Sequence, residues 1–115
     1  MTDDQKMQAI RFIKWHISNR RGFNLRYKKA TGDVTERAVL PFYITENGRG
    51  QVYVIGYDSL RRERRSFRLD RFLAIGKRDD KPAIEQSILE QLARWAKIEA
   101  PVGKILAKWA GPARA

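Results

Sequence analysis

The chain has 115 residues, of which 24 are Lys or Arg and 13 are Asp or Glu, so its formal net charge at pH 7 is +11. This length and a hydrophobic content of 43% predict one folded domain over residues 1–115 and exclude a disordered chain. The absence of cysteine excludes disulfides and thiolate chemistry. The basic surplus is typical of proteins that bind nucleic acid, another polyanion or an anionic membrane.

Residues 1–20 predict one helix. Thr2 and Gln5 have the spacing of a capping box. The apolar residues that follow recur at helical spacing, with two aromatic residues widening the stripe: Met7, Ile10, Ile13, Ile17, Phe12 and Trp15. His16 is the only histidine, and we expect it at the helix surface or partly packed rather than as a ligand.

The acidic start of the chain lacks the basic and apolar regions of a signal peptide. No apolar run in the sequence is long enough to cross a bilayer. We therefore expect a soluble, cytoplasmic protein without a membrane partner.

Residues 22–76 change to an apolar period of two, which predicts strands. Turn signals divide the segment into short strands, and residues 52–57, which are apolar on both faces, predict a central strand. Pro41 interrupts a strand and predicts a bulge, a corner or an edge position. Several short strands with tight turns predict a small antiparallel β-barrel of about five strands.

Residues 80–110 return to helical spacing. Pro82 follows an acidic start and opens a helix, and Pro101 separates it from a second one. The fold class is therefore α+β, a small barrel flanked by one N-terminal helix and a C-terminal helical pair. Because the two helices carry more apolar surface than a small barrel needs, we expect a homodimer. Their apolar stripes are Ile84, Ile88, Leu92 and Trp95, then Val102, Ile105, Leu106 and Trp109.

Residues 61–72 hold six arginines and two acids, yet Phe67 and Leu69 lie among them and must be buried. Alternation places Arg65 on the face of Phe67, and Arg68 on the opposite face with Asp70, which we expect to orient a neighbouring arginine. Arginine suits phosphate because its planar fork donates two parallel hydrogen bonds. The segment therefore predicts a pocket or groove for a phosphate-bearing ligand. The alternative is a basic edge strand protected against aggregation.

The order of residues in this segment resembles a family signature. Residues 65–72, Arg-Ser-Phe-Arg-Leu-Asp-Arg-Phe, resemble the strand R-T-F-R-L-D-R-I of WYL domains, which follows the Trp-Tyr-Leu strand that names the family. Val52-Tyr53-Val54 stands in the place of that triplet, so only the tyrosine is retained. Leu25-Arg26-Tyr27 and Val39-Leu40-Pro41 resemble the family's first strand and its proline junction, so the similarity spans about residues 23–75.

The resemblance implies an Sm-like or SH3-like barrel and a ligand-sensing regulator. WYL domains include ones that bind single-stranded DNA, and they occur beside bacterial defence systems. The binding positions that the resemblance carries over are Tyr53, Arg65, Arg68 and Arg71. WYL proteins often carry a winged helix-turn-helix before the domain and an α/β extension after it. One N-terminal helix is not a helix-turn-helix, so any binding of nucleic acid falls to the barrel or to a partner chain.

Catalysis is not expected. There is a single histidine, Ser66 has no base nearby in the sequence, and the chain has no P-loop, dinucleotide fingerprint or Cys/His metal site. The acids are scattered among basic neighbours, as ion-pair partners would be: Glu36, Glu46, Asp58, Glu63 and Asp70. We expect no enzyme activity, no metal and no cofactor.

Two classes of function remain. In the first, the chain binds single-stranded nucleic acid or a nucleotide-like effector, with arginines on phosphate and tyrosines on a base: Arg26, Arg65, Arg68, Arg71, Tyr53 and Tyr57. A sponge for a nucleotide signal would use the same residues. In the second, the chain dimerises or docks on an effector enzyme or a transcription complex through its helices. Its anchors would be Trp15, Trp95 and Trp109, which alternatively close the open ends of the barrel.

Overall fold

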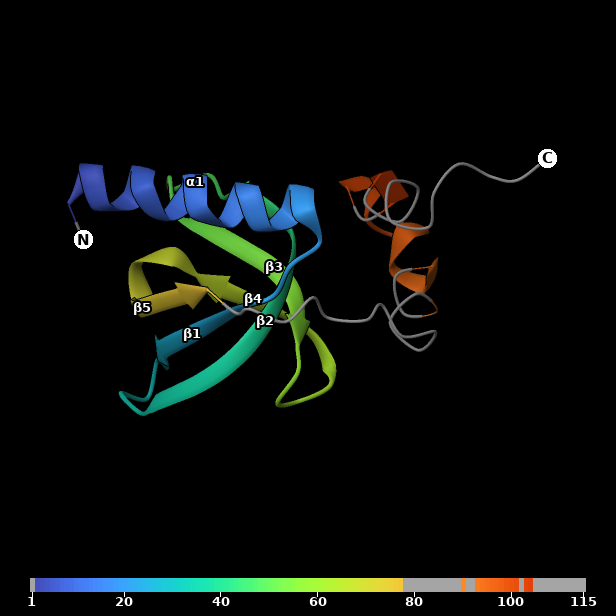
Figure 1. The fold of residues 1–115 in the computed structure, drawn as a ribbon. Coiled ribbons are helices and arrows are strands. Elements are labelled where there is room, and N and C mark those ends of the chain that lie inside the picture. The colour runs from blue at the N-terminus through green and yellow to red at the C-terminus, as the bar shows by residue number, and fades with distance from the viewer. Residues whose placement is uncertain (1, 78–89, 91–92, 102, 105–115) are drawn as a thin grey trace. The chain divides into compact units, whose positions relative to one another are not determined.

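The computed structural model describes residues 2–77, 90, 93–101 and 103–104. The chain forms two compact units, Met1–Lys81 and Pro82–Ala115. The first unit consists of one helix and a five-stranded sheet (Figure 1). Its elements are α1 (Asp3–Asn19), β1 (Phe23–Lys28), β2 (Val34–Glu46), β3 (Val52–Asp58), β4 (Glu63–Arg68), the 3₁₀ helix η1 (Leu69–Arg71) and β5 (Phe72–Lys77).

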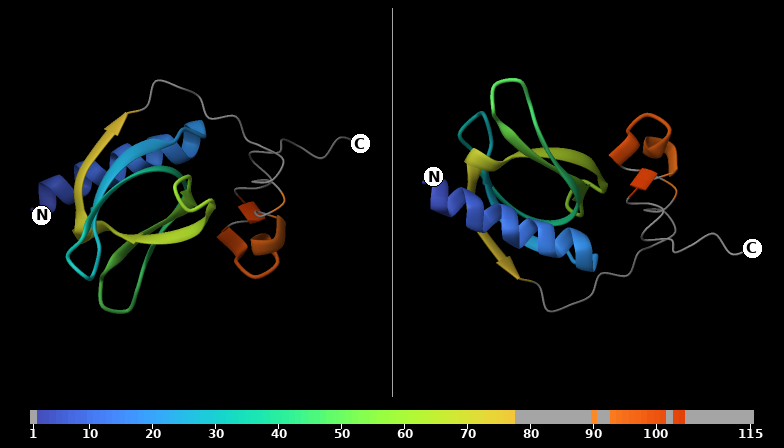
Figure 2. Two further views of the ribbon diagram at one scale, coloured as in Figure 1. Left: turned by 90° about the horizontal axis from the view of Figure 1, so that it is seen from below. Right: turned by 90° about the horizontal axis from the view of Figure 1, so that it is seen from above.

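The sheet has the strand order β4-β3-β2-β1-β5, and every neighbouring pair is antiparallel. This confirms the α+β class and the N-terminal helix. The expected closed barrel is wrong, because β4 and β5 remain the two edges of a curved, open sheet (Figure 2). A closed barrel would need β5 to pair with β4 as well as with β1. The 3₁₀ helix η1, which buries Leu69 directly after β4, separates these two strands, and β5 pairs with β1 only.

The start of α1 has the expected capping box. The Thr2 hydroxyl accepts a hydrogen bond from Gln5 N at 3.1 Å, and Thr2 N donates to Gln5 Oε1 at 2.9 Å. The helix ends at Arg20, which adopts the left-handed conformation with φ 53°. Both ends therefore satisfy backbone groups that a helix leaves unpaired.

The buried face of α1 differs from the expected stripe. Ala9, Ile13 and His16 are its buried residues, whereas Met7 and Trp15 are exposed. The expectation that His16 lies at the surface or is only partly packed is wrong, since its exposed fraction is 2%. Its Nδ1 lies 2.7 Å from the carbonyl oxygen of Phe12, one helical turn earlier. A local backbone partner thus allows a polar ring to pack among apolar ones.

One core lies between α1 and the inner face of the sheet. In β1 buried and exposed residues alternate strictly, which is the expected period of two. The core residues are Ala9, Ile13, Phe23, Leu25, Tyr27, Val39, Val52, Val54, Phe67, Leu69 and Phe72.

Strand β2 pairs with two neighbouring strands. Its first half pairs with β1 from Val34 to Val39, and its second half pairs with β3 from Val39 to Glu46. A register shift between Pro41 and Tyr43 confirms the expected irregularity at the proline.

The expected C-terminal helical pair falls mostly outside the described residues. Within the described part of the second unit, residues 90, 93–96, 100–101 and 103–104 are helical. Ile98 N and Glu99 N both donate to the carbonyl oxygen of Trp95, at 2.9 and 2.7 Å. Across the described residues, no helix has the length and apolar character needed to cross a membrane.

Gly56 allows β3 to pass close to the irregular part of β2, which yields a stability prediction. A Cβ at Gly56 would lie 2.6 Å from the Leu40 carbonyl oxygen and 3.1 Å from the Pro41 Cα. Gly56→Ala should therefore lower the free energy of unfolding by about 1–3 kcal/mol, as overpacking does, when measured by urea denaturation. Gly48→Ala is the matched control because nothing lies within 4 Å of its Cβ position. Equal stability of the two variants would contradict the prediction.

Candidate functional site

Strands β3 and β4 place two tyrosine–arginine pairs on one face of the sheet. In their register Tyr53 lies opposite Arg68, and Tyr57 lies opposite Arg64. Directly opposite residues have Cβ atoms about 4.5–5.5 Å apart, and residues separated by two or four positions on a strand share a face. The two pairs therefore form one continuous surface, and all four side chains are half-buried.

Tyr43 extends this surface onto β2. It lies opposite Ile55 of β3, between the two pairs. Its hydroxyl accepts a hydrogen bond from Arg64 Nη2 at 3.4 Å. We name these residues the tyrosine–arginine face: Tyr43, Tyr53, Tyr57, Arg64 and Arg68. Sequence reasoning missed Tyr43 because the register shift after Pro41 decides which side of β2 it takes, and it assigned Arg64 no binding role.

Packing of the core sets the position of Arg68. Phe67 lies opposite Val54 on the inner face, and both belong to the core. The backbone N–H of Arg68 donates to the Tyr27 hydroxyl at 3.0 Å. A slip of one residue would turn Phe67 outward, so this register is strongly specified. Arg68 Nε lies 2.8 Å from Asp70 Oδ1, which agrees with the expected orienting role of Asp70.

The structure does not bring Arg65 to this face. Arg65 lies on the inner side of β4, where its Nη2 contacts Glu63 Oε1 at 2.6 Å and its Nε lies 4.0 Å from Asp58 Oδ2. Arg71 ends η1, three residues after Arg68, and is half-buried. Arg65 and Arg68 are thus divided, because residues an odd number of positions apart on a strand point to opposite faces.

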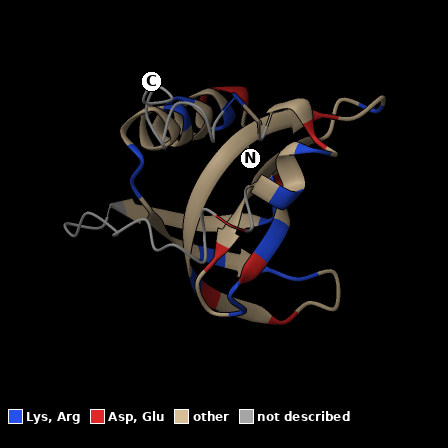
Figure 3. Ribbon diagram, turned by 90° about the vertical axis from the view of Figure 1, so that its right-hand side faces the viewer, with Lys and Arg blue, Asp and Glu red and all other residues tan. Residues whose placement is uncertain are grey.

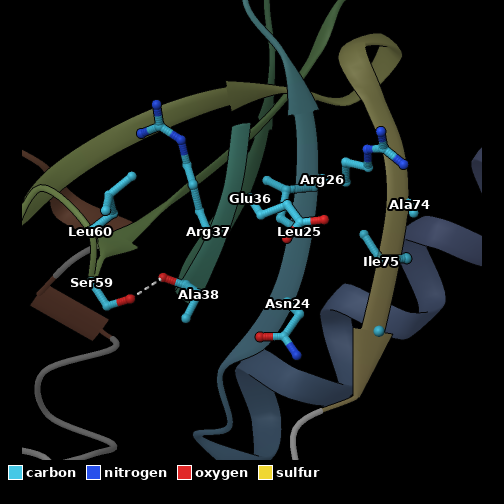
Figure 4. A pocket seen from close by; sticks show the side chains of 11 residues that line it. Asn24, Leu25, Arg26, Glu36, Arg37, Ala38, Ser59, Leu60, Ala74 and Ile75 are labelled. Carbon is cyan, nitrogen blue, oxygen red and sulfur yellow. Dashed lines mark hydrogen bonds between the residues drawn. The ribbon is translucent and has the colours of Figure 1, made fainter. Parts of the chain in front are cut away.

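Arg26 also lies apart from the tyrosine–arginine face. It is an exposed residue of β1, opposite Glu36 of β2 and Ala74 of β5. It lines a cavity of about 720 Å³ (Figure 4). Of the predicted site residues, Tyr53, Tyr57 and Arg68 therefore share one surface, and Arg26 belongs to another.

A buried ion pair joins Arg37 of β2 to Asp58, the last residue of β3. Arg37 Nη1 donates to Asp58 Oδ2, with side-chain exposures of 2% and 0%. Arg37 Nε donates to Thr35 Oγ1 at 3.0 Å, and the Leu60 N–H donates to Asp58 Oδ1 at 3.0 Å. The guanidinium lies over the Phe67 ring, 5.8 Å from its centre. Sequence reasoning identified Asp58 as an ion-pair partner but missed Arg37. The available signal was that Arg37 lies two residues before the buried Val39 and therefore shares its face of the strand.

Most of the basic surplus belongs to the first unit. Residues 2–77 hold 17 of the 24 basic residues and 8 of the 13 acidic ones. Figure 3 shows the basic positions spread over several elements, with acidic positions between them. Among the described residues, no three His, Cys, Asp or Glu side chains come together in a group that could hold a metal ion.

Comparisons with known proteins agree with this architecture. A family model described as "WYL domain" matches residues 8–76. Among solved structures, the proteasome accessory factor B/C (PafBC) of Arthrobacter aurescens is similar, with a TM-score of 0.64 and 27% sequence identity. The similarity covers 72% of this chain and 13% of that one, so this chain spans a small part of the length of PafBC. No curated protein matches the chain.

The buried ion pair yields a prediction that distinguishes structural from surface carboxylates. Asp58→Asn should lower the free energy of unfolding by about 3–5 kcal/mol, because it leaves the Arg37 charge buried without its partner. Asp70→Asn, which removes a half-exposed pair with Arg68, should cost about 1 kcal/mol or less. Both are measured by urea denaturation. Adding Arg37→Met to Asp58→Asn should recover stability, and a further loss in the double variant would contradict the assignment.

Proposed function

The chain belongs to the WYL domain family, whose members are generally ligand-sensing regulatory modules, and from this we propose that it binds single-stranded nucleic acid through its tyrosine–arginine face. The observation that carries the proposal is the register of β3 and β4, which sets Tyr53 directly opposite Arg68. An aromatic ring beside a guanidinium matches a base beside its phosphate. We propose a binding and regulatory role and no catalytic one.

The chemistry of the two side chains favours a single strand over a duplex. A tyrosine ring stacks on an unpaired base, and such stacking contributes about 1–3 kcal/mol per base with little sequence preference. The arginine fork donates to phosphate oxygens in parallel. Three tyrosines on one face offer successive stacking positions, whereas the bases of a duplex are already stacked on each other.

Preorganisation supports the same proposal. Arg68 is held by its backbone hydrogen bond to Tyr27 and by the contact with Asp70. A side chain that is already ordered loses less entropy when it binds. The net positive charge adds long-range attraction for a polyanion, which salt screens.

The similarity to a segment of PafBC supports a regulatory role for this module. PafBC is described as a proteasome accessory factor, and the matched part is 13% of its chain. The same kind of domain therefore occurs within a larger accessory protein. A partner chain or further domains would supply what the binding module itself does not.

A second candidate function is association with another copy of this chain. Trp15 on α1 is 47% exposed, and the Arg21 guanidinium lies 5.7 Å from the centre of its ring. Tryptophan and arginine are the residue types most enriched at interface hot spots. In sedimentation at micromolar concentration, a dimer that Trp15→Ala converts to monomer would support this candidate. Monomer mass for the unmodified chain would exclude it.

The nucleic-acid proposal predicts that Arg68 and Tyr53 each contribute to the binding of a single strand. Arg68→Ala should weaken binding of a labelled single-stranded oligonucleotide by about 1–3 kcal/mol, the loss typical of a well-placed arginine contact. Tyr53→Ala should weaken it by a similar amount, since a stacked base is lost. Fluorescence anisotropy with DNA and RNA oligonucleotides of equal length measures both, and circular dichroism checks that the variants fold.

Two control variants distinguish binding at the tyrosine–arginine face from general electrostatic attraction. Arg65→Ala removes the same charge from the inner side of β4 and should change the affinity far less than Arg68→Ala. Arg61→Ala, in the exposed turn before β4, should mainly reduce the slope of log affinity against log salt, by about one unit or less. If Arg68→Ala binds like the unmodified chain at two salt concentrations, the tyrosine–arginine face is not the binding site.

A further inference from the structure

A second site lies on the other half of β2. The cavity of about 720 Å³ is lined by residues of β1, β2 and β5 and by the segment that follows β3 (Figure 4). Its volume falls within the range of about 300–1,000 Å³ typical of pockets for small molecules. It shares no residue with the tyrosine–arginine face, so it is a separate site and does not depend on the function proposed above.

The floor of the cavity consists of small residues. Asn24 of β1 lies between Ala38 of β2 and Gly76 of β5 in the register of the sheet. Two residues further along β1, Arg26 lies opposite Ala74 of β5. Ala38, Ala74 and Gly76 carry a methyl group or no side chain. A planar ring can therefore approach the backbone of the sheet closely here, which larger side chains would prevent.

One wall of the cavity is fixed by hydrogen bonds. Ser59 N and Ser59 Oγ both donate to the Ala38 carbonyl oxygen, at 3.0 and 2.8 Å. Leu60 follows, and its N–H is held by the buried carboxylate of Asp58. The wall is therefore held against β2 before any ligand arrives, which is the condition for a preformed pocket.

Besides Arg37, which is paired with Asp58, the lining of the cavity holds one cation and one anion that do not pair with each other. Arg26 and Glu36 lie opposite each other in the register of β1 and β2, and both are exposed. Within the described residues neither takes part in an ion pair. Figure 4 shows the Arg26 side chain extending toward β5, while Glu36 reaches over β1. The two charges are thus offered to a ligand at separate points of one cavity.

We propose that this cavity binds a guanine nucleotide. Arg26 would hold the phosphate, because its fork donates two parallel hydrogen bonds to phosphate oxygens. Glu36 would accept hydrogen bonds from the ring N–H and the exocyclic amine of guanine, two adjacent donors that match the two oxygens of a carboxylate. The base would lie on the small-residue floor, with the Asn24 amide at its side.

The test uses guanosine monophosphate as the probe, with the full chain and isothermal titration calorimetry. The unmodified chain should bind guanosine monophosphate at least about tenfold more tightly than adenosine, cytidine or uridine monophosphate. Arg26→Gln should weaken binding by about tenfold or more, on the scale of one charge-assisted hydrogen bond. Glu36→Gln should remove the preference for guanine. Amide shifts in NMR spectra should move at Asn24, Ala38 and Gly76.

Matched controls make each outcome decisive. Lys28→Gln removes a charge from the same outward side of β1 without touching the cavity, and it should leave the affinity within about twofold of the unmodified chain. Arg68→Ala should also leave it unchanged, and Arg26→Gln should leave oligonucleotide binding unchanged. No heat or shift with millimolar nucleotide would overturn the proposal, as would equal losses from Arg26→Gln and Lys28→Gln. Loss of both ligands in Arg68→Ala would show that there is only one site.

Discussion

The buried ion pair between Arg37 and Asp58 is the interaction on which both surfaces depend. Two charges removed from water are tolerated only when each has close partners. Here the guanidinium also donates to Thr35, and the carboxylate also accepts the N–H of Leu60. Because Asp58 ends β3 and its carboxylate orders the start of the following turn, the pair sets where the chain leaves one strand for the next. It therefore positions one wall of the cavity and the beginning of β4.

The start of β4 in turn decides what the sheet displays. With Glu63 opposite Asp58, Phe67 lies in the core and Arg68 faces outward beside Tyr53. A shift of one residue would exchange these faces and bury a charge. The geometry of the tyrosine–arginine face is therefore a consequence of core packing, and the proposed binding residues are ordered by contacts that maintain the fold.

An open sheet gives a small domain two surfaces from one core. Strand β2 spans 13 residues and pairs with β1 along one half and with β3 along the other. Gly56 permits the close passage at Pro41 that joins the halves. The cavity and the tyrosine–arginine face thus share a strand without sharing a residue, so that the two proposed ligands would have distinct places on the first unit.

The sequence by itself determined the helix and the strand segments of the first unit and its family. It did not determine η1, because alternation predicted that Leu69 and Asp70 continue the arginine strand. The capping box, the change of period near residue 22, the irregularity at Pro41 and the arginine signature are local patterns, and each is complete within one segment. Local patterns also determined that Arg65 and Arg68 take opposite faces of their strand.

Only the tertiary structure decided which side chains meet. Closure of the sheet required β5 to pair with β4 as well as with β1, and β5 pairs with β1 alone. Burial of His16 depended on aromatic rings of α1 and β1, including Phe23, with ring centres 5.8 Å apart. Grouping of Tyr43 with Arg64, and separation of Arg26 from both, depended on register across strands. Packing between segments that are distant in the sequence sets the register. The spacing of residues within one segment therefore does not predict it.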